Sequence, residues 1–213
     1  MNRCIIYDLD GTLADTIKDI ANSVNLTRQD YNLEPLSLDH IVSLTGDGAK
    51  KLIERSFADH PINIDEGVEK QTKHYYNHPV VHSVLYPGVA EGLAILKDAG
   101  WKQAVLTNKP GKVAREILKR LGISEILDDI IGGNDGYPLK PDPTAVLYLA
   151  DKYQAEIGAS WVLGDNHTDM NSARNSGMNG AFAEWGFGFL GDAQCDVRFK
   201  NYSEFVQYLI KQS

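Results

Sequence analysis

Two aspartates two positions apart give the strongest chemical signal in this sequence. Asp8 and Asp10 stand in the run Asp-Leu-Asp-Gly-Thr, directly after an apolar segment. A strand places side chains two positions apart on the same side, so both carboxylates converge where Gly11 lets the chain turn. By chance, Asp-x-Asp-Gly-Thr arises in only about one chain in several hundred. Since carboxylate oxygens are hard ligands and the sequence has no cysteine cluster, the pair favours Mg²⁺ over Zn²⁺.

Three further polar groups follow segments that we predict as strands. Thr107 and Asn108 form the first group, Lys140 the second, and Asp165 with Asp169 the third. Any one of them alone fits a turn or a helix N-cap. Ligands bind at the carboxyl ends of the strands in open α/β sheets. Four polar groups in this order therefore indicate a single active site.

The elements that must position these side chains are predicted as strands alternating with helices. The strand segments are nearly continuous in apolar residues, which is typical of a sheet covered on both faces. The alternation predicts an α/β fold, a doubly wound parallel sheet with a Rossmann-like core. The predicted strands are Cys4–Leu9, Gln103–Leu106, Asp129–Ile131, Trp161–Leu163 and Gly180–Ala183, and the predicted helices are Val89–Ala99, Val113–Leu121, Pro143–Tyr153 and Ser203–Lys211.

Residues 16–82 interrupt this alternation, because they show helical patterns and no convincing strand. The segment follows the first strand directly, and the alternation resumes only after Tyr86-Pro87-Gly88. We therefore predict a small all-helical cap domain at 16–82, inserted into an α/β catalytic core formed by 1–15 and 83–213. The predicted cap helices are Ile17–Tyr31, Ala49–Phe57 and Glu66–Tyr76.

The composition restricts the classes of partner. The chain has 213 residues, with 21 basic and 29 acidic side chains and a net charge of −8. Nucleic-acid and anionic membrane surfaces are bound by clustered Lys and Arg, so neither partner is expected. Cys4 and Cys195 cannot form a disulfide framework, and no apolar run approaches the ~20 residues that span a bilayer. These features predict a cytoplasmic protein and leave its oligomeric state open.

The set of motifs resembles the haloacid-dehalogenase-like hydrolases over almost the whole chain. The run Asp8–Leu13 is specific for that superfamily. Looser patterns at Leu85–Val89, Leu106–Pro110 and Thr45–Arg55 look like its phosphoglycolate phosphatase branch. The resemblance implies a Mg²⁺-dependent phosphatase that acts on a small phosphorylated metabolite. Dehalogenases and phosphonoacetaldehyde hydrolases that resemble this chain lack an aspartate at the position of Asp10, so both activities become unfavoured.

The resemblance also implies a role for each core motif. Asp8 resembles the nucleophile that forms an aspartyl-phosphate, which splits one hard displacement into two easier ones. Asp10 resembles the general acid that protonates the leaving oxygen and then serves as the base for water. Thr107 and the backbone amide of Asn108 resemble the pair that holds the phosphate. Lys140 resembles the cation that balances the nucleophile and the phosphate.

A metal site follows from the same resemblance. Asp8, Asp165 and the backbone carbonyl of Asp10 resemble the Mg²⁺ ligands, with Asp169 as a second carboxylate nearby. The negative charges of Asp8, Asp165 and Asp169 would be balanced by Mg²⁺ and Lys140 while Asp10 is protonated. The pocket would then be near neutral before a phosphate dianion enters.

Substrate choice is assigned to the cap, because the core binds only the phosphoryl group that all phosphomonoesters share. Gly46, Asp47 and Gly48 form a candidate close-approach loop, since glycines let backbone amides reach a small ligand. A helix beginning after this loop would present its N-terminus to an anion. Arg55, or a neighbouring lysine, could pair with a substrate carboxylate. A small acid suits this loop better than a sugar, and the resemblance to the phosphoglycolate phosphatase branch implies 2-phosphoglycolate as the leading substrate.

Other interpretations stay open. A β-phosphoglucomutase-like enzyme would use Asp8 and Asp10 to move phosphate between two sugar hydroxyls, and a phosphatase could act on a sugar phosphate, a nucleotide or pyrophosphate. A non-catalytic binding module is disfavoured because the motif set is intact. His167 either reaches the pocket mouth or is solvated, and the loop Glu184–Phe189 either borders the mouth or packs on the sheet edge. A solvated His167 and a loop packed on the sheet edge are the favoured interpretations.

Overall fold

A six-stranded parallel sheet forms the centre of the molecule in the computed structural model, which describes residues 2–212. Its strands are β1 Cys4–Tyr7, β4 Lys102–Leu106, β5 Asp129–Ile131, β6 Trp161–Gly164, β7 Asn179–Ala183 and β8 Val197–Phe199. Their order is β5-β4-β1-β6-β7-β8, and every neighbouring pair is parallel. The predicted fold class is confirmed. Because β1 lies in the middle of the sheet, the residues that follow it emerge at the centre of the carboxyl edge.

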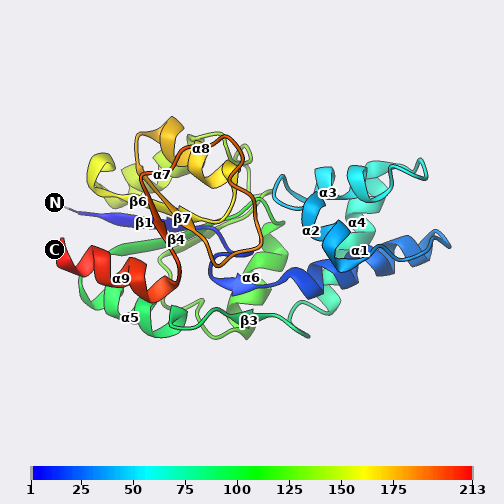
Figure 1. The fold of residues 1–213 in the computed structure, drawn as a ribbon, viewed down its shortest axis with the longest axis horizontal. Coiled ribbons are helices and arrows are strands. Elements are labelled where there is room, and N and C mark those ends of the chain that lie inside the picture. The colour runs from blue at the N-terminus through cyan, green and yellow to red at the C-terminus, as the bar shows by residue number, and fades with distance from the viewer. Residues whose placement is uncertain (1, 213) are drawn as a thin grey trace.

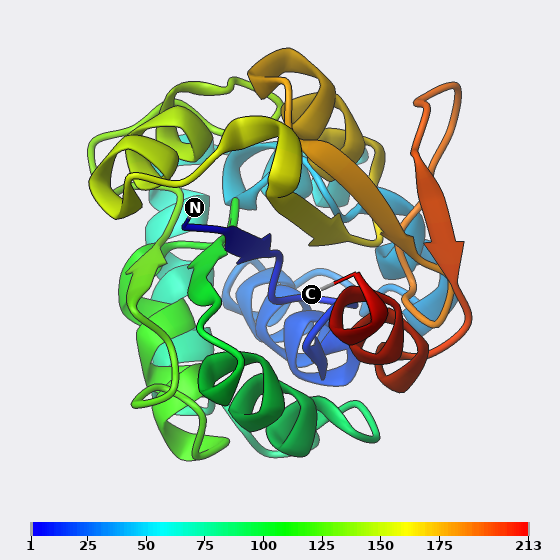
Figure 2. The same cartoon turned by 90° about the vertical axis from the view of Figure 1, so that its left-hand side faces the viewer.

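Helices cover both faces of this sheet, as Figure 2 shows. They are α5 Val89–Asp98, α6 Gly111–Arg120, α7 Thr144–Tyr153, α8 His167–Ser176 and α9 Tyr202–Lys211, with a short 3₁₀ helix η1 at Ile157–Ala159. Ile5 and Tyr7 of β1 pack with residues of α5, α6 and α9, whereas Cys4 and Ile6 pack with residues of α7. This two-sided burial explains why the strands are continuous apolar runs in the sequence.

The segment between β2 (Ala14–Asp15) and β3 (Val84–Leu85) is helical and lies beyond the carboxyl ends of the central strands (Figure 1). Its helices are α1 Ile17–Asp30, α2 Leu38–Leu44, α3 Ala49–Ser56 and α4 Ile64–Asn77. We call residues 16–82 the cap segment. Its status as a separate domain stays a prediction, and the ends of the predicted core ranges at 1 and 213 lie outside the described residues.

The two ends of the cap segment are fastened to each other. β2 and β3 pair in antiparallel orientation. Asp19, in the first turn of α1, is 1% exposed and accepts hydrogen bonds from the backbone N–H groups of Val81, His82 and Ser83. The Ser83 hydroxyl also donates to Asp19, at 2.6 Å. The entry and exit of the cap segment are therefore held as one unit beside the core.

The differences between the predicted and observed elements have local causes. The predicted first strand runs to Leu9, but β1 ends at Tyr7 because the Leu9 carbonyl accepts the N–H groups of Leu13 and Ala14 in a turn. Helix α8 was not predicted, since its sequence is mostly polar and only its packed face is buried. The short elements α2, β2, β3 and β8 were also missed. No helix within residues 2–212 combines the length and apolar character needed to cross a bilayer.

Candidate active site

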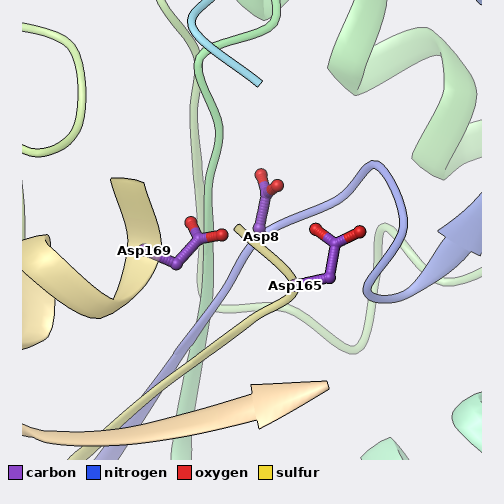
Figure 3. Close-up of side chains that lie close together, drawn as sticks. All are labelled: Asp8, Asp165 and Asp169. Carbon is purple, nitrogen blue, oxygen red and sulfur yellow. The ribbon is translucent and has the colours of Figure 1, made fainter. Parts of the chain in front are cut away.

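Three carboxylates meet at the carboxyl edge of the sheet (Figure 3). Asp8 follows β1, and its backbone N–H donates to the Leu163 carbonyl of β6 at 2.9 Å, which joins the ends of the two strands. Asp165 follows β6, and Asp169 stands in the first turn of α8. Each carboxylate offers an oxygen, and these oxygens lie within 4.8 Å of one another. The fold thus brings together the aspartates of two distant sequence motifs.

Lys140 places a buried positive charge between two of these carboxylates. Its ammonium lies 3.0 Å from Asp8 Oδ1 and 2.6 Å from Asp169 Oδ1, and the side chain is 2% exposed. Burial disfavours the charged ammonium, but the carboxylates of Asp169 and Asp8 outweigh burial and raise the pKa of Lys140. Lys140 therefore stays protonated at neutral pH and fixes the orientation of the Asp8 carboxylate.

Asp165 is enclosed by glycine backbone. A Cβ atom on Gly11 would stand 1.9 Å from Asp165 Oδ2, and one on Gly186 would stand 2.3 Å from the same oxygen. The Gly188 N–H donates to this Oδ2 at 2.7 Å. Burial, together with the negative charges of the two neighbouring aspartates, raises the pKa of Asp165 well above its usual value. Glycines are required here because any side chain would occupy the space of the carboxylate.

The loop Glu184–Phe189 borders the site, so the favoured interpretation of a loop packed on the sheet edge was wrong. Phe187 and Gly188 line the active-site cavity. The Trp185 indole N–H donates to the Thr12 carbonyl at 3.0 Å, which anchors this loop to the turn after β1. The error arose because glycine- and aromatic-rich composition does not say which surface a loop covers.

The acidic cluster fits a divalent metal ion. Asp8 and Asp165 line the cavity and present hard oxygens. A bound cation would offset both the burial and the repulsion from neighbouring carboxylates that raise the pKa of Asp165. Asp169 differs from these two aspartates, because its Oδ1 is bound to Lys140 and its Oδ2 accepts the Asn166 N–H at 3.1 Å. Asp169 therefore contributes negative charge and holds Lys140 in place.

Both side-chain oxygens of Asp10 have partners. The Thr16 hydroxyl donates to Oδ1 at 2.5 Å, and the Lys109 ammonium lies 2.8 Å from Oδ2. Thr16 is fully buried at the start of the cap segment, so the orientation of the Asp10 carboxylate depends on where the cap segment joins the core. Because Thr16 holds Oδ1, the oxygen that would exchange a proton with a ligand in the cavity is Oδ2, which the Lys109 ammonium also contacts.

Lys109 is a cavity residue that the sequence analysis missed. Its side chain is 5% exposed, and its Nζ lies 4.2 Å from the centre of the Tyr75 ring of α4 as well as beside Asp10. The available signal was its position directly after the predicted phosphate-binding pair Thr107 and Asn108. Lys109 thus joins a core loop to a cap helix across the cavity.

The side chain of Asn108 is hydrogen-bonded to the backbone of Lys140. Its side-chain Oδ1 accepts the Lys140 N–H at 2.8 Å, and its Nδ2 donates to the Lys140 carbonyl at 3.0 Å. Nδ2 also donates to the Gly46 carbonyl of the cap segment at 3.3 Å. Thr107, at the end of β4, is 3% exposed and lines the cavity with Asn108. The sequence motif drew attention to the Asn108 backbone, whereas the structure adds a positioning role for its side chain.

The loop before α3 lies directly against the core. Gly46 and Gly48 line the cavity and have φ angles of +111° and +89°, which glycine adopts without strain. A Cβ atom on Gly46 would stand 2.4 Å from Asn166 Nδ2, and one on Gly48 would stand 3.3 Å from the Asn108 carbonyl oxygen. The cap segment is therefore closed over the site at this loop.

Asp47 and Arg55 do not belong to the described residues that line the cavity, and their role in binding substrate stays a prediction. The Arg55 guanidinium donates to Asp47 Oδ2 at 2.6 Å and to the Leu44 carbonyl at 3.2 Å. The side chain of His167 is 39% exposed, and its Nε2 lies 3.5 Å from Asp47 Oδ1. Arg55 and Asp47 therefore form an ion pair beside His167, at the contact between cap segment and core.

A small cavity remains between the core motifs and the cap segment, with a volume of about 70 Å³. This is room for a few water molecules or one small ligand. Its floor is polar, whereas much of its cap side is apolar. The cap side is formed by Ile20, Thr45, Gly46, Gly48, Ala49, Leu52, Gln71 and Tyr75, and the core side by Asp8, Asp10, Thr107, Asn108, Lys109, Pro110, Val113, Lys140, Asp165, Asn166, Phe187 and Gly188.

Comparison with known proteins identifies the family. A family model described as "Haloacid dehalogenase-like hydrolase" matches residues 5–183. The chain belongs to the haloacid dehalogenase-like hydrolases. Among these hydrolases it is similar to "Phosphoglycolate phosphatase" of Aquifex aeolicus, with 33% identity over 207 residues that cover 97% of this chain and 96% of the relative. It is also 33% identical to "Phosphoglycolate phosphatase" of Colwellia psychrerythraea over 193 residues, covering 87% and 85% of the two chains.

Solved structures agree with this placement. The crystal structure of a predicted phosphoglycolate phosphatase from Haemophilus somnus superposes with a TM-score of 0.91 at 27% identity and covers 97% of both chains. These findings confirm the superfamily and the phosphatase branch that the motifs resemble. This haloacid dehalogenase-like hydrolase is therefore a phosphatase.

Proposed function

We propose that this phosphatase hydrolyses 2-phosphoglycolate through a phosphoaspartate on Asp8, with Mg²⁺ as its metal. The observation that supports the chemistry most strongly is the Asp8 carboxylate, which lies 3.0 Å from the Lys140 ammonium on the floor of a small cavity that Asp10 also lines. The names of relatives that align with almost the whole chain support the substrate.

Asp8 acts as the nucleophile in the first half of this reaction. One of its carboxylate oxygens forms a bond to phosphorus, and the bond between phosphorus and the glycolate oxygen breaks. Lys140 holds Asp8 Oδ1 by its charge, which leaves Asp8 Oδ2 as the attacking atom. Positioning of this kind is a main source of catalysis in phosphoryl transfer.

Asp10 moves the protons. Its Oδ2 gives a proton to the leaving glycolate oxygen in the first half of the reaction. In the second half it takes a proton from the water that attacks phosphorus, which restores the Asp8 carboxylate and releases phosphate. The Thr16 hydroxyl keeps the carboxylate in place through Oδ1 in both halves. Such general acid–base help is typically worth about 10²–10⁴-fold.

The phosphoryl oxygens are held by groups at the carboxyl ends of the strands. The Thr107 hydroxyl, the Asn108 backbone amide and the Lys140 ammonium are donors at the cavity wall. Asp8, Asp165 and the Asp10 backbone carbonyl would hold Mg²⁺, which offsets negative charge on the phosphoryl group. A cytoplasmic location and a small phosphorylated metabolite as the partner, both expected from the sequence, remain part of this proposal.

The cavity favours a small substrate over a sugar phosphate. Its volume is about 70 Å³, and its cap side includes the apolar side chains of Ile20 and Leu52. A sugar has several hydroxyls that would need partners after leaving water, whereas glycolate carries one carboxylate. A sugar-phosphate mutase is disfavoured for the same reason.

The test is a phosphate-release screen with Mg²⁺ over 2-phosphoglycolate, sugar phosphates, nucleotides and pyrophosphate. We expect the highest kcat/KM for 2-phosphoglycolate, loss of activity in excess chelator and recovery with Mg²⁺. Ca²⁺ should bind and inhibit, because it takes more ligands at longer distances. A kcat/KM for any sugar phosphate above that for 2-phosphoglycolate would contradict the substrate assignment. Full activity in chelator would contradict the metal.

A further inference from the structure

Lys109 is a buried cation whose position calls for a ligand. Among the described residues that line the cavity, the basic side chains are Lys140 and Lys109. Lys140 is held between the carboxylates of Asp8 and Asp169, so it belongs to the part of the site that holds the phosphoryl group. Lys109 has one carboxylate partner, Asp10, and one aromatic face, Tyr75. Its side chain is 5% exposed, and a lysine so deeply buried usually has a full set of partners.

The position of Lys109 relative to the leaving group follows from Asp10. The leaving oxygen must lie within hydrogen-bond reach of Asp10 Oδ2 to receive its proton. The Lys109 ammonium lies 2.8 Å from that same oxygen. A group attached one carbon beyond the leaving oxygen can therefore come within reach of the ammonium. In 2-phosphoglycolate that group is the carboxylate.

The surroundings make this contact selective. Ile20 and Leu52 line the cap side, and Val113 and Pro110 line the core side. An anionic group on the substrate would leave water for a largely apolar space, which costs free energy unless a fixed cation meets it. The ring of Tyr75, whose centre lies 4.2 Å from the Lys109 Nζ, stabilises the ammonium through its π face.

We propose that Lys109 is the residue that recognises the substrate carboxylate and so determines the preference for small phosphorylated acids. This inference rests on the proposed function. It assigns to Lys109 the pairing with a substrate carboxylate that the sequence predicted for Arg55. Lys109 binds the substrate carboxylate, while Thr107, Asn108 and Lys140 hold the phosphoryl group that all substrates share.

Binding of two phosphonates tests this directly. 3-Phosphonopropionate is 2-phosphoglycolate with a methylene in place of the bridging oxygen, and propylphosphonate has the same chain without the carboxylate. Their inhibition constants are measured against hydrolysis of p-nitrophenyl phosphate, in the wild type and in Lys109→Met. The ratio of the two constants reports recognition of the carboxylate and cancels any general effect of the substitution on Asp10.

We expect the wild type to bind 3-phosphonopropionate more tightly, and Lys109→Met to reduce this preference by about 10–150-fold, which is the worth of a charge-assisted hydrogen bond. Lys109→Gln is a second neutral variant should methionine disturb packing, and thermal unfolding verifies that both fold. Lys112→Met is the matched control. Lys112 is exposed, lies outside the cavity and has its Nζ 4.0 Å from the Tyr76 ring. This control should keep the wild-type preference.

A preference that survives in both Lys109 variants would overturn the inference, and so would a wild type that binds the two phosphonates equally. Turnover of 2-phosphoglycolate by the wild type is measured in parallel. High turnover with a preference independent of Lys109 removes only this inference. Poor turnover with a preference that depends on Lys109 supports the carboxylate site and removes only 2-phosphoglycolate as the substrate.

Discussion

Replacement of Asn108 by alanine should separate the stability of the fold from the positioning of Lys140. The side chain of Asn108 makes a reciprocal pair of hydrogen bonds with the Lys140 backbone, at 2.8 Å and 3.0 Å. Lys140 is buried, and its ammonium is bound to Asp8 and Asp169. Without Asn108, the Lys140 backbone loses both partners, and its loop must move to find water.

The magnitude follows from these two hydrogen bonds. Each contributes about 0.5–1.5 kcal/mol to folding, so Asn108→Ala should lower the free energy of unfolding by about 1–3 kcal/mol. For a chain of this size, that corresponds to a fall in Tm of roughly 2–12 °C. The effect on catalysis should be larger, because a shift of about 1 Å in a positioning group costs about 10²-fold in rate.

The cap segment offers a matched control. Asn25 makes the same reciprocal pair with the backbone of Leu36, donating to its carbonyl at 3.0 Å and accepting its N–H at 2.9 Å. Asn25 lies outside the described lining of the cavity. Asn25→Ala should therefore cost a similar free energy of unfolding while kcat stays at the wild-type value.

The assays are urea unfolding followed by circular dichroism, and kcat at saturating substrate and Mg²⁺ well below the Tm of each variant. Two results would contradict the positioning of Lys140 by Asn108. If Asn108→Ala unfolds earlier but keeps the wild-type kcat, Asn108 does not position Lys140. If Asn25→Ala loses as much kcat as Asn108→Ala, the loss reflects general destabilisation.

Three other predictions follow from single contacts. Asp10→Asn should lower kcat by about 10²–10⁴-fold for an alkyl phosphate but much less for p-nitrophenyl phosphate, whose leaving group needs little protonation; equal losses on both would contradict the assignment of the general acid. Gly186→Ala should raise the Mg²⁺ concentration needed for half-maximal activity, because the added Cβ would meet Asp165 Oδ2. Gly158→Ala is the control, since its Cβ would stand in open space and should leave that concentration unchanged. Identical Mg²⁺ curves for the two variants would count against the metal site. The hydrogen bond from Arg115, opposed by a smaller burial effect, lowers the pKa of Asp135. This pair therefore contributes less than about 1 kcal/mol to the free energy of unfolding. The contribution is fully present above the pKa of Asp135 in the unfolded chain, about 3.9, and it is lost as the pH falls through the lower pKa of Asp135 in the folded chain. Asp135→Asn should lower Tm at pH 7 and have little effect at the lowest pH at which the chain stays folded; an equal fall in Tm at both pH values would contradict it.

The sheet and the catalytic floor were predictable because local signals determine them. The residues Cys4–Tyr7 are buried on both faces of the sheet and so form a continuous apolar run. Asp8, Thr107 and Asp165 each follow a strand directly, and parallel strands bring such residues to one edge. Sequence spacing alone therefore placed the core motifs together.

The cap side of the site was not predictable in the same way, because it depends on which charges meet after folding. Arg55 and Lys109 are both basic residues near suitable motifs. The structure pairs Arg55 with Asp47 outside the cavity and leaves Lys109 inside it. Likewise, nothing local in the sequence shows that Gly186 and Gly188 surround Asp165. These contacts join residues far apart in the chain, which periodicity and spacing cannot detect.

In the proposed reaction, Asp8 carries the phosphoryl group during turnover. A single-turnover reaction with 2-phosphoglycolate and Mg²⁺, quenched in acid after milliseconds and analysed by peptide mass spectrometry, tests it most directly. We expect a transient gain of one phosphoryl group on Asp8 that decays as free phosphate appears and is absent in Asp8→Asn. Rapid phosphate release with the Asp8 peptide unmodified throughout, or a folded Asp8→Asn variant with wild-type turnover, would contradict it.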